Sequence, residues 1–245
     1  MKNINIIFLI LILVLIIFFL FYKEMFNEQK ICICMSYTPN IKSYSEIAEK
    51  INKKYALKNN YAIKVFDKEV KNRAPQWCKI EVINELLQKN MYEYLFWIDS
   101  DAFFNKHNMK IEDIIENDKD KNIIICSDDV NNGNEDKNRI TVNTGTIIVK
   151  CNEWSKDFFK LIWDYETEYR FKPLHEQTVL ENFIKLNVMD CKKYISVKDG
   201  KLFNSETYQQ LYDGNLYNNF IVHLAAMSTE ERIKHMEDWF HKNDN

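Results

Sequence analysis

Residues 94–104 read YLFWIDSDAFF, so an apolar run leads directly into two aspartates on either side of one serine. The apolar run predicts a buried strand over 94–98. Asp99 and Asp101 then stand at the carboxyl end of that strand, where open α/β sheets bind their ligands. Buried carboxylates need a compensating charge, and a divalent cation such as Mg²⁺ or Mn²⁺, which also binds phosphate oxygens, suits them. The apolar flanks favour this metal site over the alternative, a solvated acidic turn.

The chain on either side of the motif alternates between strand and helix patterns. Predicted strands cover 30–36, 61–66, 94–98, 123–126 and 141–150, and predicted helices cover 45–57, 77–87, 153–169, 176–186 and 229–241. Thr38-Pro39-Asn40 predicts a turn after the first strand, a polar loop covers 128–139, and Ser228 with Glu231 caps the last helix. This order predicts a single α/β domain over 30–245.

An apolar segment precedes this domain. Residues 6–21 read IIFLILILVLIIFFLF, which predicts a transmembrane helix over 5–22, after a tail at 1–4 and before a short stem at 23–29. No small residues follow the run as a signal-peptidase site would require, so we expect a retained signal-anchor. Lysines lie on both sides of the run and leave both orientations open.

Charge and cysteine content exclude some functions. The net charge is −3, with 33 basic and 36 acidic residues interspersed along the chain, so there is no basic field for nucleic acid to bind. Six cysteines are scattered, and Cys32 and Cys34 fall on one face of the first strand. Their spacing favours buried thiols over a zinc site, while disulfides in a lumen remain open.

Four segments, LFWIDSDAFF, VNTGTIIVKCNEWS, HEQTVL and FIVHLAAMS, follow one another along the chain. As an ordered set they resemble glycosyltransferase family 34, and the resemblance spans about 30–232. It implies a nucleotide-diphospho-sugar transferase fold of the GT-A type, with a single Rossmann-like mixed sheet. It also implies a retaining glycosyltransferase that is a single-pass type II membrane protein of the Golgi or another endomembrane.

The resemblance implies that Asp99, Asp101 and His223 ligate manganese, or magnesium in its place. A neutral imidazole is a suitable third ligand beside two carboxylates. Without the resemblance, His223 would be interpreted as a hydrogen-bonded histidine at the end of a strand.

The resemblance also implies that Glu176 and Gln177 face the reacting sugar carbon. A carboxylate or amide oxygen there can stabilise the cationic sugar that develops as the diphosphate leaves. The family often has two acids where this chain has His175-Glu176, and both covalent attack and front-face displacement stay open. The alternative for Glu176 is a residue stabilised by the dipole at a helix N-terminus.

Further residues are expected to bind the donor. By resemblance, Lys79 reaches the donor, and Asn143 and Gly145 let the sugar approach the backbone, although a solvated helix lysine and a strand-entry turn are the alternatives. Ser36 and Tyr37 end the first strand and are expected to face the nucleoside, where a tyrosine ring can stack on a base.

Two more residues close to the metal ligands in the sequence are expected to bind the donor. Ser100 lies between the aspartates. Arg232 is expected to hold the diphosphate, because the family often has a basic residue about five positions after the histidine, where this chain has Ser228.

These features predict transfer of a hexose or pentose, of the galactose, mannose, xylose or glucose type, from a UDP-sugar or GDP-sugar to a glycan or glycoprotein. A metal-dependent phosphohydrolase and an inactive subunit of a glycosyltransferase complex are the alternatives. Hydrolysis without transfer would favour the first, and loss of Mn²⁺-dependent UDP binding would favour the second.

Overall fold

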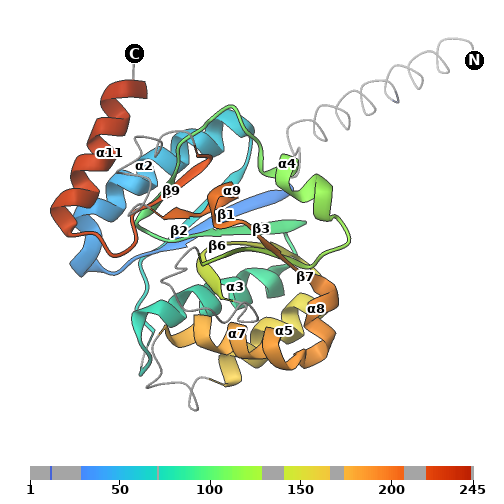
Figure 1. Cartoon of the computed structure of the whole chain (residues 1–245). Coiled ribbons are helices and arrows are strands. Elements are labelled where there is room, and N and C mark those ends of the chain that lie inside the picture. The colour runs from blue at the N-terminus through green and yellow to red at the C-terminus, as the bar shows by residue number, and fades with distance from the viewer. Residues whose placement is uncertain are drawn as a thin grey trace, which may run out of the picture.

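The computed structural model describes Ile12 and residues 29–70, 72–128, 141–165, 174–206 and 219–243. Its centre is a mixed sheet in the order β2-β1-β3-β6-β5-β7 (Figure 1). These strands are β1 (Ile31–Ser36), β2 (Ala62–Phe66), β3 (Tyr94–Ile98), β5 (Ile123–Ser127), β6 (Val142–Lys150) and β7 (Ile195–Lys198). The pairs β1–β2, β1–β3 and β5–β7 are parallel, while β6 runs antiparallel to both β3 and β5.

Helices cover both faces of this sheet. In Figure 1, α2 and α11 lie on one face, and α3, α5, α7 and α8 lie on the other. The described helices are α2 (Lys42–Asn59), α3 (Cys78–Lys89), α4 (Ile111–Ile115), α5 (Glu153–Asp164), α7 (His175–Leu186), α8 (Cys191–Tyr194), α9 (Gly200–Phe203) and α11 (Thr229–Asn243). Short 3-10 turns cover Pro39–Ile41, Pro75–Trp77, Glu116–Asp118 and Val188–Asp190.

Strand β1 shows how the sequence produces two hydrophobic cores. Its side chains alternate, so that Ile33 and Met35 pack in the cluster beneath α2, while Cys32 and Cys34 pack in the cluster beneath α3. Both cysteines are buried free thiols. The prediction that they share one strand face as structural thiols is therefore confirmed.

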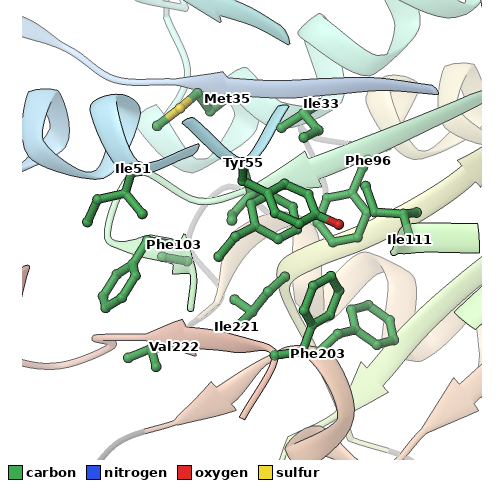
Figure 2. Close-up of a cluster of buried hydrophobic side chains, with 14 of the residues drawn as sticks. Ile33, Met35, Ile51, Tyr55, Phe96, Phe103, Ile111, Phe203, Ile221 and Val222 are labelled. Carbon is green, nitrogen blue, oxygen red and sulfur yellow. The ribbon is translucent and has the colours of Figure 1, made fainter. Parts of the chain in front are cut away.

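A second, smaller sheet packs beside the first in the order β4-β9-β8. It consists of β4 (Ala102–Phe104), β9 (Ile221–His223) and β8 (Ser205–Glu206). Figure 2 shows Phe103, Ile221 and Val222 of this sheet in the same hydrophobic cluster as Tyr55 of α2 and Phe96 of β3. The small sheet is thus anchored to the main core.

Asn52 ties α2 to the small sheet. Its amide nitrogen donates to the Ala102 carbonyl at 3.1 Å, and its amide oxygen accepts from the Phe104 backbone N–H at 3.0 Å. The side chain is completely buried, so both bonds form away from water and fix β4 in place. The chain that follows the Asp-Ser-Asp motif is therefore rigidly held.

The sequence predicted most elements but not their ends. The strand at 94–98 is confirmed residue for residue as β3, and the Ser228–Glu231 cap is present, with reciprocal bonds of 2.8 and 3.3 Å. The helix predicted over 153–169 is wrong in its length, because α5 ends at Asp164, and 166–169 lie outside the described residues. Sequence patterns did not predict β4, β7 or β8, which are short, and gave no bounds for β9, although His223 was expected at the end of a strand.

Two predicted segments fall largely outside the described part of the chain. Apart from Ile12 and Gln29, the anchor at 5–22 and the stem at 23–29 are not described, and of the polar loop at 128–139 only Asp128 is described. Among the described residues, no helix has both the length and the apolar character needed to cross a bilayer.

Candidate functional site

The Asp-Ser-Asp motif forms a tight turn at the end of β3. The Asp99 N–H donates to the Gly145 carbonyl of β6 at 2.8 Å, and the Ala102 N–H donates back to the Asp99 carbonyl at 3.0 Å. The turn brings Asp99 and Asp101 together, and ligand atoms of these carboxylates and of His223 all lie within 4.8 Å of one another. Three residues predicted as metal ligands therefore meet in one place.

His223 reaches the aspartates through the small sheet. It ends β9 and pairs with Ala102 of β4, and the Leu224 N–H donates to the Asp101 carbonyl at 2.9 Å. Its Nε2 lies 3.3 Å from Asp101 Oδ1. Two carboxylates and an imidazole are a set of ligands that suits Mn²⁺ well and Mg²⁺ less well. The residues present therefore fit the divalent cation expected from the sequence.

Gly145 makes room for the imidazole. A Cβ atom at this position would lie 2.3 Å from His223 Cε1 and 2.6 Å from its Nδ1. No side chain fits there without moving the ring, which is a typical reason for glycine inside a strand. The sequence predicted that this glycine lets the sugar approach the backbone, and that role stays a prediction. Asn143 lies two residues earlier, and its Oδ1 accepts from the Gly145 N–H at 2.8 Å.

Lys79 lies behind the motif in a buried network. Its ammonium group lies 3.1 Å from Asp99 Oδ1 and 3.1 Å from Glu176 Oε1, and it donates to the Thr144 carbonyl at 2.9 Å. The residue is only 4% exposed. Burial acts to lower the pKa of Lys79, but the two carboxylates outweigh it and the pKa is raised. Lys79 therefore stays charged and joins α3 to β3, β6 and α7.

Glu176 and Gln177 lie in the first turn of α7 against the same strand β6. Gln177 Oε1 accepts from the Thr144 N–H at 3.2 Å, and Glu176 Oε1 accepts from the Thr144 hydroxyl at 3.0 Å. Burial raises the pKa of the Glu176 carboxyl, Lys79 opposes this, and the Asp99 charge adds to it. Glu176 Oε2 is buried and has no hydrogen-bond partner within the described part of the chain. The Glu176 carboxylate is thus linked to Asp99 through Lys79.

A cleft of about 320 Å³ opens in front of the aspartates, at the carboxyl ends of the adjacent parallel strands β1 and β3. A cleft of this volume is large enough for a small ligand. Of the residues predicted from sequence, it is lined by Ser36, Tyr37, Lys79, Asp99, Ser100 and Asp101. The lining does not include Asn143, Gly145, Glu176, Gln177, His223 or Arg232. The predicted site therefore divides into a cleft and a set of residues behind and beside it.

The residues that end β1 are held in defined positions. Ser36 Oγ lies 3.0 Å from Cys78 Sγ, and the Tyr37 hydroxyl donates to the Glu49 carboxylate. Tyr37 lines the cleft, and its ring is held in place because its hydroxyl is engaged on α2 and its side chain packs against the core. A fixed aromatic ring is suited to stacking against a flat ligand.

Arg232 contacts Asp101, whereas Lys79 contacts Asp99. Its Nη2 lies 2.9 Å from Asp101 Oδ2, and its Nε donates to the Leu224 carbonyl at 3.1 Å. Burial acts to raise the pKa of Asp101, but the neighbouring His223 and Arg232 outweigh it and hold the pKa at about 2. The sequence predicted a diphosphate contact for Arg232. Its observed partner is a carboxylate, and the predicted contact stays a prediction.

Sequence reasoning missed three contributors to the site. Tyr44 lines the cleft beneath the Arg232 guanidinium, which lies 4.8 Å from its ring centroid. Trp97 donates from Nε1 to Asp99 Oδ1 at 2.7 Å, and Thr144 binds both Lys79 and Glu176. Trp97 and Thr144 stand inside the quoted motifs, so their position next to named site residues was an available signal. Tyr44 directly precedes the predicted helix and carried no such signal.

Comparison with known proteins identifies the family. Residues 27–234 match the sequence model of the galactosyl transferase GMA12/MNN10 family. The chain belongs to this family. Glycosyltransferase family 34 and the nucleotide-diphospho-sugar transferase superfamily, which the ordered motifs indicated, are therefore confirmed.

A curated relative and two solved structures are similar to this GMA12/MNN10 family member. Xyloglucan 6-xylosyltransferase 2 of Arabidopsis thaliana is 35% identical over 86 residues, which are 33% of this chain and 17% of that protein. A glycosyltransferase involved in glycosylation of the major capsid of PBCV-1 superposes with a TM-score of 0.67 at 18% identity, covering 85% of this chain and 98% of that one. The galactosyltransferase LgtC superposes with a TM-score of 0.53 at 12% identity, covering 84% and 95%. These structures confirm the α/β fold of the GT-A type with a mixed central sheet.

Proposed function

We propose that this chain is a retaining, divalent-metal-dependent glycosyltransferase that moves a hexose or pentose from a nucleotide-diphosphate sugar to a glycan acceptor. The observation that carries the proposal is the convergence of Asp99, Asp101 and His223 ligand atoms within 4.8 Å of one another. Both aspartates also line a cleft of about 320 Å³. A bound Mn²⁺ or Mg²⁺ would neutralise charge on the diphosphate leaving group.

In this proposal the protein binds the donor along the cleft. The nucleoside stacks against the fixed ring of Tyr37, with Ser36 beside it and Ser100 at the diphosphate end. A UDP-sugar is the preferred donor and a GDP-sugar the second choice. Asn143 and Gly145 border the sugar through the backbone of β6.

Glu176 and Gln177 are the proposed groups for the sugar carbon. The support is that Glu176 Oε2 is buried without a hydrogen-bond partner among the described residues, and that its carboxylate shares Lys79 with Asp99. A fixed carboxylate in such a position stabilises developing positive charge on the sugar. The proposal leaves the choice between covalent attack and front-face displacement to experiment.

The proposal extends to the acceptor, the domain bounds and the membrane anchor. A glycan or glycoprotein is the acceptor, and residues 30–245 form the catalytic domain on a stem at 23–29. The apolar segment 5–22 supports a single-pass type II anchor in the Golgi or another endomembrane, where a place in a glycosyltransferase complex is open.

The test is a panel of UDP-sugars and GDP-sugars assayed for nucleotide release with Mn²⁺, with EDTA, and with and without glycan acceptors. Asp101→Asn should lower Mn²⁺-dependent release by about two orders of magnitude or more. Asp120→Asn is the matched control, because this aspartate is exposed and pairs only with its neighbour Lys121 among the described residues. Acceptor-independent hydrolysis as the main activity would indicate a phosphohydrolase. Absence of any Mn²⁺-dependent turnover or UDP binding would contradict the proposal.

A further inference from the structure

Each aspartate of the proposed metal site already has a positively charged side chain beside it. Lys79 Nζ lies 3.1 Å from Asp99 Oδ1, and Arg232 Nη2 lies 2.9 Å from Asp101 Oδ2. The two cations approach from different elements, α3 and α11. The aspartate pair is therefore electrostatically compensated before any metal arrives.

Arg232 is held firmly in this position. Its Nε donates to the Leu224 carbonyl at 3.1 Å, and its guanidinium lies over the Tyr44 ring, 4.8 Å from the centroid. Its backbone N–H donates to the Ser228 carbonyl at 3.0 Å in the first turn of α11. A guanidinium fixed by Leu224 and Tyr44, on a backbone that is itself fixed in the helix, adds a steady positive potential to the site, which a freely moving surface arginine would not do.

Tyr44 and Asp101 connect Arg232 to the cleft. Both residues line it, so the guanidinium lies directly behind one of its walls. The side chain of Arg232 is 17% exposed and that of Asp101 is 15% exposed, so water screens their charges only partly. The field of Arg232 therefore extends to ligands bound in the cleft.

This field has opposite effects on the two ligands of the proposed function. A free divalent cation at Asp99, Asp101 and His223 would stand close to a fixed positive charge and would be repelled. A nucleotide diphosphate carries negative charge and would be attracted by the same guanidinium. When a cation arrives bound to a diphosphate, the attraction of the diphosphate offsets the repulsion of the cation.

We propose that Arg232 lowers the affinity of this site for a free divalent cation and raises its affinity for a nucleotide diphosphate, so that cation and nucleotide bind together rather than cation first. The proposal rests on the proposed function, because it takes Asp99, Asp101 and His223 as the cation ligands. It assigns to Arg232 an electrostatic action on both ligands that needs no direct contact with the cation.

The test compares Arg232→Gln, Arg232→Lys and Lys234→Gln with the wild type. Lys234→Gln is the matched control, because it removes the same charge from an exposed position of the same helix. Binding of Mn²⁺ alone is measured from the loss of its free-ion electron paramagnetic resonance signal. Binding of UDP at saturating Mn²⁺ is measured by calorimetry.

Arg232→Gln should bind Mn²⁺ alone about tenfold more tightly than the wild type, and should bind UDP about threefold more weakly. Arg232→Lys keeps the charge and should stay within about 1.5-fold of the wild type for both ligands. Lys234→Gln should change neither. Damage to the fold would weaken the binding of both ligands. Tighter binding of Mn²⁺ together with weaker binding of UDP is therefore specific to the electrostatic account.

This inference would be overturned if Arg232→Gln bound Mn²⁺ alone more weakly than the wild type does. The proposed function would still stand if the wild type bound UDP in the presence of Mn²⁺. Arg232 would then serve to hold Asp101 in place. Unchanged affinities for both ligands would overturn it too. A wild type that binds neither Mn²⁺ nor UDP would overturn the proposed function together with this inference.

Discussion

Two cations flank the Asp-Ser-Asp turn, and they are built into the molecule in different ways. Lys79 has a side chain only 5% exposed and bridges Asp99 to Glu176, with Thr144 as a further partner. Arg232 has a side chain 17% exposed, and lies on the C-terminal helix with one carboxylate and one carbonyl as its bonded partners among the described residues. The difference teaches that Lys79, although it lines the cleft, is part of the buried interior, whereas Arg232 is a partly exposed cation behind the cleft wall.

The largest expected effect comes from removing the interior cation. Lys79→Met would leave Glu176 buried with its carboxylate uncompensated, which should cost about 3–5 kcal/mol of unfolding free energy. Urea unfolding measures the loss. Lys89→Met, at the exposed end of the same helix, should change stability by less than about 1 kcal/mol.

A double variant tests the cause of that loss. Adding Glu176→Gln to Lys79→Met removes the unpaired charge, so part of the stability should return. The assignment of Lys79 to the interior would be refuted by a single variant as stable as the wild type.

A smaller effect is expected at Gly145, where strand β6 of the main sheet approaches His223 of the small sheet. Gly145→Ala places a methyl group 2.3 Å from His223 Cε1, so the imidazole must move. We expect a loss of about 1–3 kcal/mol of stability, as in other overpacked sites, together with weaker Mn²⁺ binding. Differential scanning calorimetry and Mn²⁺ titration measure the two effects.

The double-mutant cycle identifies the clashing partner. In a His223→Ala background the imidazole is gone, so Gly145→Ala should cost less stability than it does in the wild type. Additive losses in the two backgrounds would argue that the glycine serves the backbone of β6 and not the histidine.

The smallest expected effect concerns the packing of α11, the helix that carries Arg232. His107 lies between Tyr55 of α2 and Trp239 of α11, with ring centroids 5.5 and 5.0 Å away. Burial, with added repulsion from Lys58 and Lys54, lowers its pKa to about 4, although a hydrogen bond to the Phe104 carbonyl opposes the shift. The unfolded chain therefore binds more protons than the folded one between pH 6.5 and about 4.

Because the folded pKa of His107 is depressed, the free energy of unfolding should fall as the pH is lowered through that window. Urea unfolding at pH 7 and pH 4.5 should show a smaller fall for His107→Gln than for the wild type. His241→Gln, on an exposed residue of α11, is the control. Equal falls in the wild type and His107→Gln would rule out this contact as the source.

The strand that carries the aspartates was predictable because its signal is local. An unbroken apolar run predicts a buried strand wherever it occurs, and the carboxyl-end rule for open sheets then places Asp99 and Asp101 at a binding site. The helices α2, α3, α7 and α11 were predictable for the same reason, since apolar spacing alone indicates them.

The pairing that completes the metal site was not predictable in this way. Strands β4 and β9 have three residues each and lie more than a hundred positions apart in the chain. Such short strands have no periodicity to detect, and their register is set by packing around Asn52 and Tyr55. His223 was therefore found through the family resemblance and not through its local sequence.

The burial of Lys79 was hidden from the sequence for a related reason. A lysine on an amphipathic helix normally faces water, and its partners Glu176 and Thr144 lie far away along the chain. Only the folded structure brings these compensating groups together. The same holds for Gly145, whose neighbour could not be named without knowing where β9 lies.

The central claim is that Asp99, Asp101 and His223 hold a divalent cation with the nucleotide of the donor. Pulsed electron paramagnetic resonance of Mn²⁺ bound with UDP tests it most directly, because it detects a directly coordinated histidine nitrogen. We predict a nitrogen coupling in the wild type and in the control His235→Ala, and its loss in His223→Ala. A wild type without the coupling, or a His223→Ala variant that keeps it, would contradict the claim.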